Sequence, residues 1–475
     1  MTLRKLIAHA SLYLVGNRAC KGIRHSRQMR YYKELCRRQW TSLEENRRIQ
    51  AERLYEMVCF SLKHVPYYRD LGLRAEDFSR ETIFEDIQKF PVLTKEIIRR
   101  EGERMHPDIK LNDWVFEATS GGTTGAPLPF RHSGAFFDAE QGAKLVYDEW
   151  GGRRIGDSQV RLWGSERDII SGKKDWMNKL YRWTRNESFL NTFVMDVARM
   201  EEYIRIINTR KPRMILAYVQ SAREMANYLR EHSRKIHAPN AIMTTSGTLT
   251  PELHDYIRDT FHCPVLNRYG TREMGDMACS CDKNEGLHIN ILGCFLEVLD
   301  DANFRCSPEV SGNIVATSLL EYAMPLIRYE IGDRGALTDH VCSCGRGLPL
   351  LKEVTGRIID WFVGSDGRIV YGDFFTHLFY TAQNVKQFQV LQETEGEIFI
   401  KLVLNDPALD MEAFYQDYTR QVRKTMGDIG VHFSIVEDIP VEPSGKRAYT
   451  ISKISRAAHR GGLRACEQKD QKPAP

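Results

Sequence analysis

The sequence predicts an α/β protein with a large, multi-sheet N-terminal domain and a small α+β C-terminal domain. The chain has 475 residues, which exceeds one compact core and suits a large domain joined to a smaller one. From about residue 114, short apolar runs bounded by Gly, Ser and Thr alternate with helical stretches, a pattern typical of largely parallel sheets. After Gly356-Arg357 the pattern changes to two strands joined by a polar turn, an amphipathic helix and another strand.

The apolar pattern also predicts individual elements. Leu54, Val58, Leu62 and Val65 form a helical stripe that stops at Pro66, so we expect the first hundred residues to be mostly helical. The other expected elements are helices at 200–207, 251–261 and 414–426 and strands at 214–217, 242–245, 264–267, 314–317, 385–390, 397–404 and 431–435. The predicted organisation is a basic helical segment at 1–50, the large domain at 51–356, a mobile C-terminal domain at 357–460 and a disordered tail at 461–475.

Composition narrows the class of protein. The net charge of +4 is small for this length and gives no reason to expect a nucleic-acid partner. A hydrophobic fraction of 42% argues against wholesale disorder. The 11 cysteines, several of them isolated, are typical of thiols in a reducing compartment rather than of a disulfide scaffold. We therefore expect a cytoplasmic protein.

The first 40 residues are strongly basic, with Glu34 as their one acid. Leu3, Leu6, Ile7 and Leu14 recur at helical spacing, which predicts an amphipathic basic helix too short to span a bilayer. No small-residue cleavage site marks a signal peptide. Packing on the large domain is the favoured interpretation, and peripheral membrane contact is the alternative.

One segment is rich in Gly, Ser and Thr: Thr119-Ser120-Gly121-Gly122-Thr123-Thr124-Gly125. Its glycines allow tight turns, and its hydroxyls and N–H groups suit an anion such as a triphosphate. It is not a Walker loop, because no Gly-Lys-Ser/Thr follows. Taken alone, it is equally compatible with a flexible linker.

Further motifs follow this segment in a fixed order: Asn267-Arg268-Tyr269-Gly270-Thr271-Arg272-Glu273, Arg328-Tyr329-Glu330-Ile331-Gly332-Asp333, Gly356-Arg357-Ile358-Ile359-Asp360 and Pro443-Ser444-Gly445-Lys446. Together they resemble the core motifs of the adenylate-forming superfamily of acyl-CoA synthetases, adenylation domains and luciferases. Val65-Pro66-Tyr67-Tyr68-Arg69 and Cys342-Ser343-Cys344-Gly345-Arg346 resemble the branch of phenylacetate–CoA ligase, coenzyme F390 synthetase and CapK-type proteins. The resemblance runs from about Leu54 to Ile454.

The resemblance implies an AMP-forming carboxylate ligase. Such an enzyme uses ATP and Mg²⁺ to convert a carboxylic acid to acyl-AMP, and the small domain then rotates to admit CoA. One alternative keeps adenylation but uses an acceptor other than CoA, in polysaccharide or secondary metabolism. A second alternative is a weakened homologue that binds nucleotide without catalysis. The sequence does not identify the acid.

The resemblance also implies residue roles. Tyr269 would stack on adenine beside Gly270 and Thr271, Glu273 would hold Mg²⁺, and Asp333 would accept the ribose hydroxyls. Arg272 departs from the Thr or Ser of the superfamily motif, which puts the α-phosphate contacts in doubt. Weaker evidence assigns the adenine-lining backbone to Ser246-Gly247-Thr248.

Two further basic residues complete the implied active site. Arg357 matches the nucleotide-contacting arginine at the domain junction, although the hinge acid stands one position later than usual, at Asp360. Lys446 matches the catalytic lysine, a cation that stabilises the charge developing at the α-phosphate.

Two Cys-x-Cys pairs, Cys279-Ser280-Cys281 and Cys342-Ser343-Cys344, lie before and after the motif that ends at Asp333. Cys281, His288, Cys342 and Cys344 can supply three thiolates and one imidazole, a set typical of structural zinc. Cys279 is an alternative to Cys281, and buried apolar thiols are the alternative to a metal site.

Overall fold

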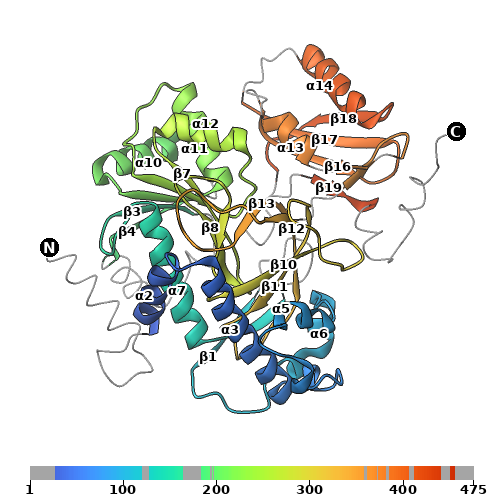
Figure 1. Cartoon of the computed structure of the whole chain (residues 1–475). Helices are drawn as coiled ribbons and strands as arrows, with labels where there is room; N and C mark the ends of the chain where they lie inside the picture. The colour runs from blue at the N-terminus through green and yellow to red at the C-terminus, as the bar shows by residue number, and fades with distance from the viewer. Residues whose placement is uncertain are drawn as a thin grey trace. The chain divides into compact units, whose positions relative to one another are not determined.

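The computed structural model describes residues 27–119, 128–163, 183, 185–192, 195, 197–357, 361–367, 369–371, 373–380, 385–405, 411–439 and 450–454. The chain divides into two compact units, Met1–Arg357 and Ile358–Pro475, which we call the large and small units. Figure 1 shows the elements of each unit.

The large unit is built on an 11-stranded sheet with the order β10-β11-β12-β13-β9-β8-β7-β6-β5-β3-β4. Its strands are β3 (Gln159–Trp163), β4 (Glu187–Asn191), β5 (Met214–Tyr218), β6 (Ala241–Thr245), β7 (Val265–Thr271), β8 (Gly275–Ser280), β9 (Leu287–Ile289), β10 (Cys294–Leu299), β11 (Gly312–Ser318), β12 (Tyr329–Thr338) and β13 (Leu350–Arg357). A separate hairpin pairs β1 (Val115–Thr119) with β2 (Pro129–Ser133).

The expectation of a largely parallel sheet is correct for only one part of this sheet. Strands β4, β3, β5, β6 and β7 are parallel neighbours. From β7 onward every pairing is antiparallel. The physical reason is the length of the connections. Helices α10, α11 and α12 connect the parallel strands, whereas three residues join β7 to β8 and allow only a hairpin.

The described helices of the large unit are α2 (Arg27–Arg38), α3 (Leu43–His64), α4 (Pro66–Arg69), α5 (Ile83–Asp86), α6 (Lys95–Glu101), α7 (Gly134–Trp150), α10 (Val197–Arg210), α11 (Val219–Glu231) and α12 (Pro251–Phe261), with 3₁₀ turns at Ala75–Asp77, Ile87–Lys89 and Gly102–Met105. Ser42 caps α3 by accepting a hydrogen bond from the backbone of Glu45. The helix ends at His64, before Pro66, as the apolar stripe predicts.

Helices α2 and α7 share one core with the parallel strands. Tyr31 and Leu35 of α2 and Val146 of α7 pack with Leu216 and Leu266, which belong to β5 and β7. A Cβ at Gly142 of α7 would lie 2.8 Å from a backbone oxygen of α2, so the absence of a side chain there permits close packing. The expected amphipathic helix with Leu3 and Leu14 lies outside the described residues.

The small unit is built on a four-stranded sheet with the order β18-β17-β16-β19. Its elements are β14 (Trp361–Val363), β15 (Ile369–Tyr371), α13 (Asp373–Tyr380), β16 (Val385–Gln392), β17 (Glu397–Leu404), α14 (Met411–Met426), β18 (Gly430–Ile435) and β19 (Thr450–Ser452). Its core contains Phe375, Phe388, Val422 and Met426. The strands and helix predicted for this region are confirmed. No helix in the described part of the chain is long and apolar enough to cross a membrane.

A buried ion pair generates a prediction for stability. Arg328 Nε donates to Glu297 Oε2 at 3.1 Å, and these side chains are 4% and 1% exposed. Arg328→Leu would leave Glu297 with Arg305 as its one remaining ion-pair partner among the described residues. We expect the free energy of unfolding in urea to fall by about 3 kcal/mol, the lower end of the loss for a broken buried pair. Arg258→Leu, at an exposed position of α12, is the control and should change it little. An equally small change for Arg328→Leu would contradict this.

Candidate functional site

The β7–β8 hairpin carries the central motif of the candidate site. Arg272, Glu273 and Met274 form its turn, where the backbone N–H of Met274 donates to Thr271 Oγ1 at 3.1 Å. A Cβ at Gly270 would lie 2.5 Å from the carbonyl oxygen of Gly275. Gly270 is therefore required by the close approach of the two strands, independently of any ligand.

Two tyrosines hold two acidic side chains on one side of this hairpin. The hydroxyl of Tyr269 donates to Asp333 Oδ2 at 2.9 Å, and both residues are buried. The hydroxyl of Tyr329 lies 3.4 Å from Glu273 Oε1, and Glu273 is also buried. Gly332, with φ of +83°, gives the backbone the left-handed conformation that precedes Asp333. The structure thus brings Asp333, which is distant in sequence, next to the hairpin that carries Tyr269 and Glu273.

Other predicted residues lie beside this group. Thr248 Oγ1 donates to the carbonyl of Thr355 at 3.2 Å, which fixes the Ser246-Gly247-Thr248 segment against β13. Ser246 has φ of +55°, a left-handed conformation. The β12–β13 register places Arg357 opposite Asp333.

Several predicted residues fall at or beyond the limits of the described structure. Thr119 is the last residue of β1, paired with Pro129. Arg272 is exposed. The residues that lie outside the described part of the chain are Ser120, Gly121, Gly122, Thr123, Thr124, Gly125, Ile359, Asp360 and Lys446. Their roles stay predictions.

Sequence reasoning did not find a buried pair that holds the hairpin turn. His132 Nε2 lies 2.9 Å from the carbonyl oxygen of Arg272, and His132 Nδ1 lies 2.9 Å from Glu321 Oε2. Both ring nitrogens of His132 therefore lie within hydrogen-bonding distance of an oxygen atom. Glu321 also accepts hydrogen bonds from the backbone of Ser133 and Ala323. The pair therefore connects β2 and the loop after β11 to the turn that carries Glu273. No sequence motif marks His132, because its partner stands 189 residues away.

The four predicted metal ligands form one cluster. The donor atoms of Cys281, His288, Cys342 and Cys344 all lie within 4.8 Å of one another. Cys281 and Cys342 are 3.6 Å apart between sulfurs, and Cys344 Sγ is 3.3 Å from His288 Nε2. Zn–S bonds of about 2.3 Å in a tetrahedron require separations of roughly 3.7 Å, so the residues fit a zinc ion. Cys279 lies outside this cluster, in the apolar core shared by α2 and α7.

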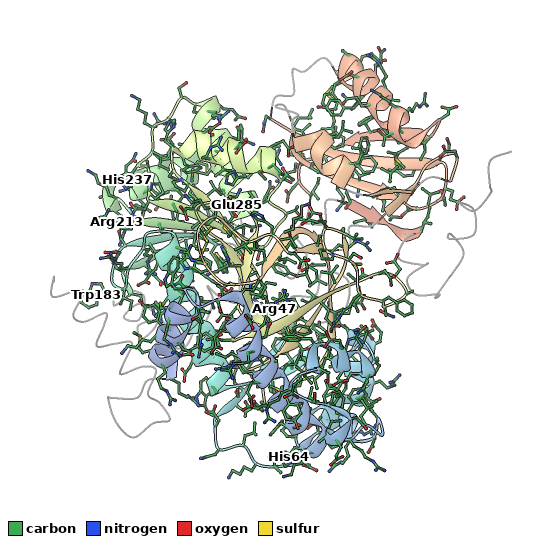
Figure 2. All side chains as sticks on the ribbon, viewed as in Figure 1. Arg47, His64, Trp183, Arg213, His237 and Glu285 are labelled. Atoms are coloured by element: carbon green, nitrogen blue, oxygen red, sulfur yellow. The ribbon has the colours of Figure 1, made fainter. Side chains whose placement is uncertain are left out.

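Electrostatics and nearby hydrogen bonds also suit a metal. Burial, with the neighbouring Arg346 guanidinium, lowers the pKa of His288 to about 4, so its imidazole is neutral near pH 7. The backbone N–H of Arg346 donates to Cys344 Sγ at 3.4 Å. Glu285, labelled in Figure 2, braces the same loop by accepting hydrogen bonds from the backbone N–H and the hydroxyl of Ser343. Ser343, followed by His340, lowers the pKa of Glu285 to about 2.

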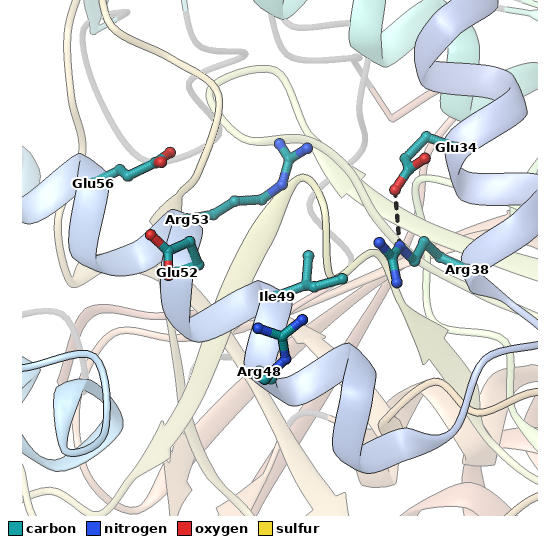
Figure 3. Close-up of a pocket in the computed structure, with 7 residues that line it drawn as sticks. All are labelled: Glu34, Arg38, Arg48, Ile49, Glu52, Arg53 and Glu56. Carbon is teal, nitrogen blue, oxygen red and sulfur yellow. Dashed lines mark hydrogen bonds and ion pairs between the residues drawn. The ribbon is translucent and has the colours of Figure 1, made fainter.

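A surface cavity of about 510 Å³ lies elsewhere, between α2 and α3 (Figure 3). It is lined by Glu34, Arg38, Arg48, Ile49, Glu52, Arg53 and Glu56. None of the residues predicted for the nucleotide site or for the metal cluster lines this cavity. Its wall carries three acidic and three basic side chains, and Glu34 pairs with Arg38 at 2.8 Å. The cavity and the candidate site thus share no residue.

Comparisons with known proteins agree with this architecture. Residues 362–453 match the family of the CapK C-terminal domain. The chain is 24% identical to protein CapK of Staphylococcus aureus over 433 residues, covering 89% of this chain and 92% of that protein. It is also 24% identical to phenylacetate-coenzyme A ligase of Thermus thermophilus over 390 residues, covering 77% of this chain and 82% of that protein. A solved structure of 2-hydroxyisobutyryl-CoA ligase in the postadenylation state superposes with a TM-score of 0.69 at 19% identity, covering 90% and 94% of the two chains.

The fold is therefore that of 2-hydroxyisobutyryl-CoA ligase. In sequence the chain is similar to protein CapK and to phenylacetate-coenzyme A ligase. The resemblance inferred from the sequence motifs is confirmed at this level.

The cysteine cluster predicts about one zinc ion per chain in purified protein, measured by elemental analysis. Cys344→Ser should lower both the zinc content and the melting temperature, because a structural metal contributes directly to folding. Cys279→Ser is the matched control and should retain the zinc. A metal-free protein with an unchanged melting temperature would contradict the zinc assignment.

The His132–Glu321 pair predicts a loss of stability on substitution. His132→Phe keeps an aromatic ring stacked on Phe136, now 4.2 Å between centroids, but removes both hydrogen bonds. Leaving a buried carbonyl and carboxylate without these donors should lower the free energy of unfolding by about 2–3 kcal/mol. His237→Phe, at a position labelled in Figure 2, is the control. Equal urea midpoints for the two variants would show that the pair does not hold the turn.

Proposed function

We propose that this protein uses ATP to convert a carboxylic acid to an acyl-adenylate and then transfers the acyl group to CoA. The relationship to phenylacetate–CoA ligase and the ligase fold support this activity.

The observation that carries the proposal is the hydrogen bond between Tyr269 and Asp333. It joins the residue assigned to adenine to the residue assigned to ribose, which stand 64 positions apart. Glu273 lies on the adjoining turn, and Tyr329 orients its carboxylate. An aromatic ring, a diol acceptor and a carboxylate that can hold Mg²⁺ are the groups that a bound ATP requires.

The proposed reaction has two steps. An oxygen of the substrate carboxylate attacks the α-phosphorus of ATP, and pyrophosphate leaves, giving acyl-AMP. The sulfur of CoA then attacks the acyl carbonyl, and AMP leaves with the bonding electrons, giving the thioester. Mg²⁺ held at Glu273 would neutralise phosphate charge. Lys446 would stabilise the charge that develops at the α-phosphate in the first step.

Product analysis tests the whole proposal. Mass spectrometry after incubation with ATP and a panel of acids should detect acyl-CoA when CoA is present and acyl-AMP when it is absent. Acyl-AMP with no thioester would favour an acceptor other than CoA. No pyrophosphate release with any acid would favour a nucleotide-binding homologue without catalysis.

The ribose assignment makes a separate prediction. Asp333→Ala should weaken ATP binding by roughly 10-fold or more in Kd, because charge-assisted hydrogen bonds contribute about 1.5–3 kcal/mol. Calorimetry with wild type, Asp333→Ala and Tyr269→Phe checks this. Tyr269→Phe breaks the same Tyr–Asp hydrogen bond but keeps the ring and the carboxylate, so it should bind ATP nearly normally. Unchanged affinity in Asp333→Ala would remove Asp333 from the site.

The lysine assignment predicts different effects on the two steps. Lys446→Ala should slow pyrophosphate release by at least ~10², the usual loss when one preorganised group at a transition state is removed. Given synthetic acyl-adenylate and CoA, the same variant should form thioester at close to the normal rate. Lys453→Ala removes another lysine of the small unit, an exposed one paired with Glu393, and should leave both steps unchanged. Equal losses in both steps would contradict the role of Lys446.

A further inference from the structure

A group of charged side chains lies on the other face of the β7–β8 hairpin, between the hairpin and α7. Successive residues of a strand point to opposite faces. Tyr269 belongs to the core on the Asp333 side, whereas Leu266, two positions before Arg268, packs with α7. Arg268 therefore faces α7, which also packs against β8. We call Glu140, Lys144, Tyr147, Arg268 and Asp276 the buried polar cluster.

Three atoms of this cluster have no hydrogen-bond partner among the described residues: Arg268 Nε, Asp276 Oδ2 and the hydroxyl of Tyr147. The side chains of Arg268 and Asp276 are 7% and 10% exposed, and Arg268 Nε lies 3.5 Å from Asp276 Oδ1. Burying a polar group without a hydrogen bond is unfavourable, most of all for a charged group. These atoms therefore favour a bound group that supplies both a donor and an acceptor.

The cluster carries balanced charge and reaches solvent at one end. Lys144 pairs with Glu140 at 2.5 Å, and their side chains are 26% and 24% exposed. A Cβ at Gly275 would lie 3.3 Å from Glu140 Cγ, so Glu140 lies against the start of β8, next to Asp276. Burial raises the pKa of Asp276, although Arg268 and Lys144 oppose this. The cluster holds two acidic and two basic side chains, so these charges balance. It therefore has no excess charge that a charged group of a ligand would neutralise.

The cluster and the candidate nucleotide site lie on opposite faces of the same hairpin. Arg268 directly precedes Tyr269, and Asp276 pairs with Gly270 across the hairpin. The two sets of side chains are thus separated by one strand.

We infer that the buried polar cluster binds the substrate acid and that this acid carries at least one hydroxyl group; the inference depends on the proposed function. A hydroxyl donates to the Asp276 carboxylate and accepts from the Arg268 guanidinium at once. An acid that lacks a hydroxyl group would leave these groups unpaired. The cluster therefore selects hydroxylated carboxylic acids.

Matched pairs of acids test the inference by pyrophosphate release with the full-length protein. Suitable pairs are 3-hydroxybutyrate with butyrate and 4-hydroxyphenylacetate with phenylacetate. A site whose buried polar groups pair with a hydroxyl discriminates strongly against analogues that lack it. In at least one pair, kcat/KM should favour the hydroxylated acid by ~10-fold or more. Equal or higher kcat/KM for the plain acid in every pair would overturn the inference and leave the proposed function intact. No release with any acid would overturn both.

Variants then link this preference to the cluster. Arg268→Met with Asp276→Leu removes both charges together and should reduce the hydroxyl preference at least ~10-fold. The control is Arg258→Met with Asp255→Leu, an exposed Arg–Asp pair on α12 at 2.5 Å, which should keep the preference. If the double variant does not fold, Tyr147→Phe removes a single hydroxyl and should also lower the preference. A preference unchanged in the folded variant would assign the selection to other residues and overturn the inference.

Discussion

The close contact between β7 and β8 at Gly270 and Gly275 is the constraint on which the rest of the candidate site depends. A Cβ at Gly270 would lie 2.5 Å from the carbonyl oxygen of Gly275, so no side chain fits between the strands at that position, and the turn is three residues long. That turn sets where Glu273 lies. It also separates two chemically different environments, with Tyr269 and Asp333 on one face and Arg268 with Asp276 on the other. A single backbone contact therefore positions both the nucleotide motif and the polar cluster.

Polar contacts from distant parts of the chain then fix this hairpin in the sheet. His132 and Glu321 hold the turn through the Arg272 carbonyl. At the other end of β8, the cluster of Cys281, His288, Cys342 and Cys344 joins two loops that leave the same sheet. Buried polar networks of this kind specify one arrangement when every member is satisfied. The hairpin is thus held at its turn by the hydrogen-bonded pair His132–Glu321 and at its base by the cluster of three cysteines and His288.

The polar interior next to α7 bears on which acids the proposed enzyme selects. In an apolar pocket, specificity between acids differing by one methylene amounts to about 1–3 kcal/mol. Paired donors and acceptors can discriminate much more strongly, because a mismatched ligand leaves them unsatisfied. Arg268 and Asp276 are nearly fully buried, and each keeps one polar atom with no hydrogen-bond partner among the described residues.

The sequence by itself determined the fold class, most elements and the relationship to the adenylate-forming ligases. These depend on local periodicity and on short motifs, such as the stripe ending at Pro66, the strand 397–404 and the order of Tyr269, Asp333 and Lys446. The tertiary structure alone decided the antiparallel half of the sheet, the His132–Glu321 pair and the polar cluster. Each of these depends on which distant residues meet across strands, and that is set by the packing of the whole sheet, which local patterns do not encode.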